Sequence, residues 1–197
     1  MDTDHVLDHA ALVVVDVQHG FDDADYWGPR NNPDCEANIV QLIAAWRRRG
    51  WPLVYVRHDS TEPMSPLHPD SPGNALKTDI VSGVPDLLVS KQVNSSFHGN
   101  PDLHAWLNAQ EISHIVICGA TTNHCCETTA RVAGNLGYDT RFVIDATHTF
   151  DRASPTEKWW PAQHLSDITA TNLHGEFATV VTTNVLLRSM NAEPAGT

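Results

Sequence analysis

The chain has 197 residues, 41% of them hydrophobic and 18% charged, which is the balance of an ordinary globular protein and predicts a single domain over residues 1–197. Its formal net charge of -12 argues against nucleic acid and anionic membranes as partners. The acidic, polar start of the chain lacks the pattern of a signal peptide, and no apolar run is long enough to span a membrane. The spacing of the cysteines suggests no disulfide framework, so we expect reduced thiols and a cytoplasmic protein.

Apolar runs rich in β-branched residues alternate with helical patterns along the chain. Residues 11–15 form the first run, which is typical of a central parallel strand buried on both faces and which ends at Asp16. A helix follows over residues 33–49, with Asn32 as a candidate N-cap and Gly50 as its stop. Further strands are predicted over 52–57, 86–90, 115–118, 140–144 and 177–182, and further helices over 102–110, 125–136 and 165–174. This order predicts an α/β fold with a mainly parallel sheet and helices on both faces.

One segment of the chain, residues 60–77, has no periodic pattern and is dense in Pro, Ser and His. Irregular chain of this length inside a compact domain is usually functional or disordered. We expect it to form a lid or a wall of a pocket.

The residues that follow the predicted strands include an acid, a base and a thiol. In parallel α/β sheets, ligands bind outside the carboxyl ends of the strands. Those ends carry Asp16, His58, Lys91, the turn at 119–125 and Asp145. A carboxylate there could take a proton from a thiol, and an ammonium could stabilise the thiolate or polarise a carbonyl.

Cys125 is the candidate nucleophile because it is predicted to open a helix. The unpaired N–H groups and the positive end of the helix dipole would lower the pKa of its thiol. The alternative is that Cys125 or its neighbour Cys126 is a small apolar residue of the core.

Three stretches carry a resemblance to a known family. They are ALVVVDVQHGF at 11–21, VSKQVNSSF at 89–97 and VICGATTNHCCETTARVAGNLGYDTRFVIDAT at 116–147. The chain resembles the isochorismatase-like cysteine hydrolases over nearly its whole length, and the pattern G-x-x-T-x-x-C-x-x-x-T-A-R in the third stretch is the most specific part of the match.

The resemblance implies a three-layer α/β/α, Rossmann-like fold with a six-stranded, mainly parallel sheet. It also implies a catalytic triad of Asp16, Lys91 and Cys125, with Cys126 in the core. The family has a non-proline cis peptide bond that would fall between Ala120 and Thr121. The backbone N–H groups of Thr121 and Cys125 would then form the oxyanion hole.

Loop residues around the predicted site are candidates for contacting a small-molecule substrate, although each could instead pack in its loop or lie exposed. They are Gln18, Phe21, Trp27, His58, His98 and His124. Nicotinamidases of the family that bind a metal carry a D-x-H motif and a further His after the second strand. Here His58 and Asp59 are not followed by a matching His, and His68 alone makes no site. We therefore expect neither a metal nor another cofactor.

The resemblance favours hydrolysis of a C–N bond in an amide, ureide or lactam through a thioester. Enol-ether hydrolysis, as in isochorismatase itself, and a non-catalytic thiol redox or scaffold role on the same fold are the alternatives. The acidic net charge, and the presence of only Arg30 and Arg57 as arginines in the candidate loops, favour a neutral or cationic substrate. Family members commonly pair, and Trp159 and Trp160 lie in a predicted loop, so we also expect a homo-oligomer.

Overall fold

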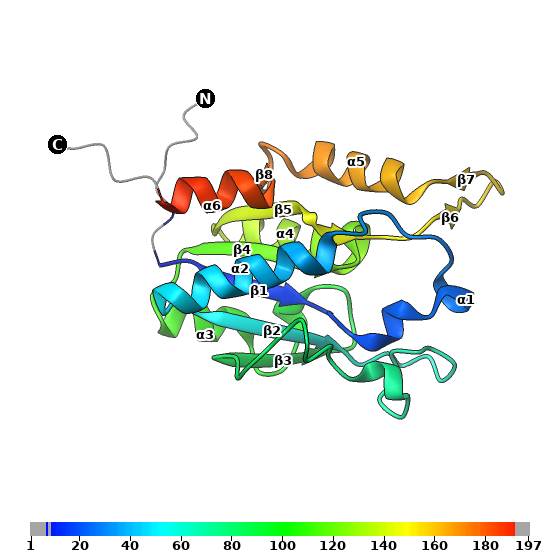
Figure 1. The fold of residues 1–197 in the computed structure, drawn as a ribbon, viewed down its shortest axis with the longest axis horizontal. Helices are drawn as coiled ribbons and strands as arrows, with labels where there is room; N and C mark the ends of the chain where they lie inside the picture. Colours follow the sequence, from blue (N-terminus) through cyan, green and yellow to red (C-terminus); the bar gives the residue numbers. More distant parts are fainter. Residues whose placement is uncertain (1–6, 8, 192–197) are drawn as a thin grey trace.

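The computed structural model describes residues 7 and 9–191, so most of the predicted non-signal N-terminus lies outside the described residues (Figure 1). In this part of the chain, six parallel strands form one sheet in the order β3-β2-β1-β4-β5-β8. Their bounds are β1 (Ala11–Val15), β2 (Leu53–His58), β3 (Leu87–Lys91), β4 (His114–Ala120), β5 (Asp139–His148) and β8 (Thr179–Val181). The predicted six-stranded parallel sheet is confirmed.

Helices cover both faces of the sheet and complete three layers (Figure 1). One face carries α2 (Cys35–Arg49) and α6 (Thr183–Asn191), and the other carries α3 (Leu103–Ala109), α4 (Glu127–Asn135) and α5 (Ala162–Leu173). Successive side chains of a strand point to opposite faces. Val14 accordingly packs in the cluster that contains Leu42 of α2, and Val13 packs in the cluster that contains Leu107 of α3. The apolar run of β1 is therefore buried on both sides, as predicted.

Several short elements and one helix were not predicted. They are α1 (Ala24–Trp27), the hairpin of β6 (Arg152–Ala153) and β7 (Trp159–Trp160), helix α6, and the single turns η1 (His19–Asp22), η2 (Pro72–Asn74), η3 (Ser96–His98) and η4 (Thr122–Cys126). Helix α2 begins at Cys35 and not at residue 33, because the Asn32 side chain donates to the carbonyls of Asp145 (2.8 Å) and Thr147 (2.6 Å) and does not cap the helix. None of the helices in the described residues is long and apolar enough to cross a membrane.

Parallel pairing brings the carboxyl ends of the strands to one edge, and a glycine lets two of them approach closely there. Gly119 of β4 lies beside Val15, the last residue of β1, at a φ of 122°. A Cβ at this position would lie 1.9 Å from the Val15 carbonyl oxygen, so a larger residue would push the strands apart. This contact places the turn after β4 directly against Asp16.

Candidate active site

The ends of β1 and β3 and the η4 turn bring together the three predicted triad residues. Lys91 Nζ donates to Asp16 Oδ2 at 2.6 Å and to Cys125 Sγ at 3.3 Å. The side chains of Lys91 and Asp16 are both fully buried. Burial lowers the pKa of Lys91, but the charge of Asp16 and the hydrogen bonds to Asp16 and Cys125 together outweigh that effect and leave the pKa raised, so the site holds an ammonium. The centre is a water-excluded ion pair with a sulfur atom against it.

His58 completes the surroundings of the ammonium. Its Nδ1 lies 3.1 Å from Lys91 Nζ, and because an ammonium can only donate, Nδ1 is the acceptor and the ring is neutral. Burial, and then the charge of Lys91, lowers the pKa of His58 and keeps it in this form at neutral pH. Donor atoms of Asp16, His58 and Cys125 lie within 4.8 Å of one another, a set that could hold a metal ion. The ammonium of Lys91 already contacts all three.

Cys125 differs from the sequence-based expectation in its local structure and in its acidity. It lies in the π-helical turn η4, and the α-helix begins only at Glu127. Burial, and then the charge of Asp16, raises the pKa of the Cys125 thiol to about 12, although Lys91 opposes the shift. The expected lowering of its pKa is therefore wrong, because burial and the charge of Asp16 together outweigh the lowering effect of Lys91. At neutral pH the resting group is a thiol, which donates to Asn94 Oδ1 at 3.7 Å.

The sulfur faces a cavity of about 180 Å³. Its lining residues are Phe21, Trp27, His58, Leu67, Asn94, Thr121, His124, Cys125 and Arg152. Four of the six predicted substrate contacts are therefore at its wall. Gln18 is not among them, because its buried amide bonds the backbone N–H and carbonyl of His58 at 2.8 and 3.0 Å and so has a structural role. His98 lies exposed on η3, away from this cavity.

Aromatic residues and the irregular segment form the fixed walls of the cavity. Trp27 stacks on Phe150 with ring centroids 5.4 Å apart, and its indole N–H donates to the Gly20 carbonyl at 2.8 Å. Leu67 brings residues 60–77 to the cavity, as expected for a pocket wall. Asn74 Nδ2 holds this segment against β2 by donating to the Leu67 carbonyl at 2.9 Å and to the His58 carbonyl at 3.1 Å.

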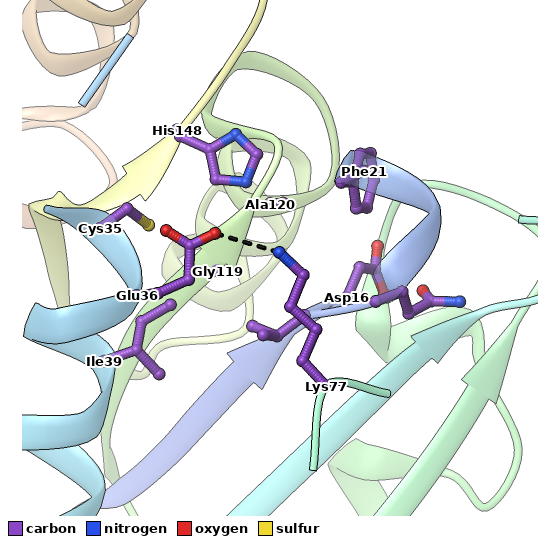
Figure 2. Close-up of a pocket in the computed structure, with 11 residues that line it drawn as sticks. Asp16, Phe21, Cys35, Glu36, Ile39, Lys77, Gly119, Ala120 and His148 are labelled. Carbon is purple, nitrogen blue, oxygen red and sulfur yellow. Dashed lines mark hydrogen bonds and ion pairs between the residues drawn. The ribbon is translucent and has the colours of Figure 1, made fainter. Parts of the chain in front are cut away.

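Asp16 also borders a second, much smaller space on its other side (Figure 2). Glu36, Lys77 and His148 point into this space, and Lys77 Nζ donates to Glu36 Oε1 at 3.2 Å. Its volume of about 10 Å³ is the size of one water molecule. Asp16 Oδ1 has no hydrogen-bond partner within the described part of the chain. Of the two oxygens of this carboxylate, Oδ2 accepts a hydrogen bond from Lys91 and Oδ1 accepts none from the described residues.

The turn between β4 and η4 adopts the expected backbone. The peptide bond between Ala120 and Thr121 is cis. The Thr121 carbonyl accepts hydrogen bonds from the N–H groups of His124 and Cys126, both at 3.2 Å. Thr121 also lines the cavity. Cys126 itself is fully buried in the core, as expected.

Leu67, Asn94 and Arg152 line the cavity but were not predicted. Asn94 lies in the stretch 89–97 that carries part of the family resemblance, so it could have been found there. Leu67 and Arg152 lie in a segment without periodic pattern and in a two-residue strand, and neither position carries a sequence signal.

Comparison with known proteins identifies the family. Residues 10–184 match the isochorismatase domain. An uncharacterized isochorismatase family protein of Bacillus subtilis, YrdC, is 41% identical over 90% of this chain and 94% of its own. The ureidoacrylate amidohydrolase RutB of Variovorax paradoxus is 30% identical over 74% of this chain and 71% of its own. The crystal structure of a putative hydrolase of the isochorismatase family from Chromobacterium violaceum superposes with a TM-score of 0.87 at 34% identity, covering 94% of this chain and 95% of that one. The chain therefore belongs to the isochorismatase family of hydrolases.

Proposed function

We propose that this protein is a cysteine-dependent hydrolase that cleaves the C–N bond of a small amide or ureide through a thioester intermediate. The observation that supports it best is the position of Lys91 Nζ, in contact with both the Asp16 carboxylate and a Cys125 sulfur that faces a cavity. Nucleophilic thiols are activated in this way by a neighbouring base and cation. The amidohydrolase RutB, a relative by sequence, supports the choice of C–N bonds.

The first half-reaction forms the thioester. Because the resting thiol is not ionised, Asp16 takes its proton as the sulfur attacks the carbonyl carbon. The N–H groups of Thr121 and Cys125 stabilise the oxyanion of the tetrahedral intermediate. Protonated Asp16 gives its proton to the leaving nitrogen, the C–N bond breaks, and the amine or ammonia departs.

The second half-reaction releases the acid. Asp16 takes a proton from a water molecule that attacks the thioester carbonyl, and the C–S bond breaks as the thiol recovers its proton. The sum of both halves is one amide and one water converted to one acid and one amine. Lys91 stays an ammonium throughout and balances the charge that moves between Asp16 and the sulfur.

The size of the cavity limits the substrate. About 180 Å³ is less than the roughly 300–1,000 Å³ typical of clefts for drug-sized ligands. The part of the substrate next to the reacting carbonyl is therefore small, and aromatic faces of Phe21 and Trp27 offer it an apolar contact.

The experiment is an ammonia-release screen over small amides and ureides with two matched variants. Cys125→Ala should lower kcat/KM by about 10³-fold or more, since it removes the nucleophile. Cys126→Ala, the adjacent buried thiol, should retain most of the activity if it folds. Similar losses in two folded variants would refute the assignment of Cys125.

The proposed chemistry needs no metal, because a thiol with a base and N–H donors can carry every step. Activity should survive exhaustive dialysis against EDTA. Loss of activity that zinc restores would contradict this part of the proposal and would direct attention to the donor set of Asp16, His58 and Cys125.

A further inference from the structure

Arg152 brings a positive charge to the cavity that contains Cys125. It lies in β6, far along the chain from the triad, and its side chain lines the inner cavity. A second, open groove of about 550 Å³ adjoins this cavity, and Trp27, Thr121, His124 and Arg152 line both. Arg152 thus stands at the junction between the thiol and the outside.

The guanidinium of Arg152 has no carboxylate within 4.0 Å among the described residues. The arginines of the other candidate loops are already paired. Glu36 accepts two hydrogen bonds from Arg30 at 2.8 and 2.7 Å, and Asp59 accepts two from Arg57 at 2.8 and 3.0 Å. Arg152 therefore has donors to offer to a ligand.

The hydrogen bond from Arg152 to His124 determines which ring nitrogen of His124 carries the proton. Arg152 Nη1 lies 3.0 Å from His124 Nε2, and because a guanidinium can only donate, Nε2 is an acceptor. The ring proton is then on Nδ1, which lies 3.1 Å from Thr121 Oγ1. Burial, and then the charge of Arg152, lowers the pKa of His124, so this ring stays neutral. The two histidines of the cavity add no charge, and Cys125 rests as a thiol.

Arg152 is consequently the one permanent charge among the described residues that line the inner cavity. The outer groove differs, because Asp25 and Asp151 line it. An anionic group is favoured beside Arg152 and disfavoured farther out. A guanidinium also matches a carboxylate in geometry, with two parallel N–H donors.

We propose that Arg152 determines specificity by binding a carboxylate of the substrate, placed within a few bonds of the scissile carbonyl. The inference rests on the proposed function only in placing that carbonyl at Cys125. It reverses the expectation of a neutral or cationic substrate, which followed from the net charge and from the arginines of the predicted loops. The local charge decides, because the field of distant surface carboxylates is screened beyond about 8–10 Å at physiological salt.

The test compares two alkylating reagents that differ in charge and act on the same sulfur. Iodoacetate is an anion and iodoacetamide is neutral, and both transfer a two-carbon group to Cys125 with loss of iodide. The rate ratio of iodoacetate to iodoacetamide is measured by mass spectrometry for the wild type, Arg152→Gln, Arg152→Lys and Arg48→Gln. Arg48 is an exposed arginine of α2, so Arg48→Gln makes the same change in net charge away from the cavity.

We expect Arg152→Gln to lower the ratio by roughly three- to tenfold, the effect of losing a charge-assisted hydrogen bond that is partly open to solvent. Arg152→Lys should fall between, because an ammonium keeps the charge without the paired donors. Arg48→Gln should leave the ratio unchanged. An unchanged ratio in Arg152→Gln, or an equal fall in Arg48→Gln, would overturn the proposal. The iodoacetamide rate reports whether Cys125 remains accessible in each variant.

A second arm uses succinamate and its neutral analogue succinamide. Succinamate should protect Cys125 from iodoacetamide at a several-fold lower concentration than succinamide, and Arg152→Gln should remove that difference. Equal protection by both in the wild type would overturn the proposal. If neither compound, nor any other amide, releases ammonia, this result counts against the proposed function. The alkylation ratio would still decide the role of Arg152.

Discussion

Two sets of side chains with similar composition meet at Asp16, and they differ in the space that is open to a substrate. The front set is Asp16, Lys91, His58 and Cys125, and the rear set is Glu36, Lys77, His148 and Cys35. Each contains a carboxylate, an ammonium, an imidazole and a thiol. The front set borders a cavity of about 180 Å³, whereas the rear set encloses about 10 Å³. Residue types alone therefore do not define a site, because a reaction also needs room for a substrate.

The lysines of the two sets, Lys91 and Lys77, also differ in the groups that they contact. Lys91 contacts the thiol of its own set at 3.3 Å. Lys77 instead joins Glu36 to Asp22, at 3.2 and 2.6 Å, and Asp22 is 55% exposed. Lys77 and Glu36 thus close the surface over the core between η1 and α2, whereas Lys91 and Asp16 place an ion pair beside the thiol of Cys125. Matched substitutions in the two sets can separate these roles.

The largest effect should come from replacing each lysine by methionine, which keeps the length of the side chain and removes its charge. Lys91→Met should lower kcat/KM by about 10²–10³-fold, the usual cost of losing one group that stabilises charge in a transition state. Lys77→Met should lower it by less than about tenfold, since that side chain does not reach the inner cavity. Steady-state kinetics on one amide substrate tests both, and equal losses in folded variants would contradict the distinction.

Removing one charge of the buried ion pair in the front set should lower the free energy of unfolding. Lys91→Met leaves Asp16 buried without its partner, which should cost about 3–5 kcal/mol of the free energy of unfolding at pH 7. The double variant Asp16→Asn/Lys91→Met removes both charges and should recover much of this loss. Urea denaturation of the single and double variants measures the difference. If the loss of stability in the double variant equals the sum of the losses in Lys91→Met and Asp16→Asn, the two residues are not coupled.

In the rear set, His148 should make the free energy of unfolding depend on pH. Burial, with a smaller contribution from the charge of Arg30, lowers the pKa of His148 from 6.5 to about 3. A histidine with a lowered pKa in the folded state binds its proton more readily when unfolded. Its contribution therefore destabilises the fold as pH falls from about 6.5 towards 3, by at most about 1.4 kcal/mol per pH unit.

His148→Gln should flatten the stability curve over this pH range, as measured by urea denaturation at several pH values. His19→Gln, at an exposed position of η1, serves as the control and should leave the slope unchanged. Equal slopes for the wild type and His148→Gln would show that His148 titrates normally in the folded protein.

Local patterns in the sequence predicted the sheet, and the polar strand ends together with the resemblance to the family predicted the front set. The β-branched run of β1 and the polar residues at the strand ends could be recognised without knowledge of distant contacts. The start of α6 could not, since the Thr183 N–H bonds the Asp145 carboxylate at 2.7 Å, from 38 residues away. The acidity of Cys125 was also misjudged, because burial by the assembled fold decides it.

Arg152 shows the same limit at the cavity. Strands β6 and β7 have two residues each and pair only with one another among the described strands, so they carry no periodic pattern that a sequence could reveal. Trp160 of this hairpin stacks on His164 with ring centroids 4.8 Å apart, which gives it an intramolecular partner. Trp159 remains 68% exposed and lines the outer groove. The predicted homo-oligomer would have this residue available as a contact.

The proposed mechanism requires a covalent intermediate on the thiol of Cys125, and acid-quench mass spectrometry during turnover can detect it. A substrate found in the ammonia-release screen is mixed with the Cys126→Ala variant, and fragmentation of the tryptic peptide 92–131 then distinguishes an adduct on Cys125 from one on Cys118. We expect Cys125 in this peptide to gain the mass of the substrate's acyl group, the adduct to disappear as substrate is consumed, and hydroxylamine to remove it. Steady turnover with no adduct on Cys125, or with an adduct on Cys35 or Cys118 instead, would contradict a thioester intermediate on Cys125.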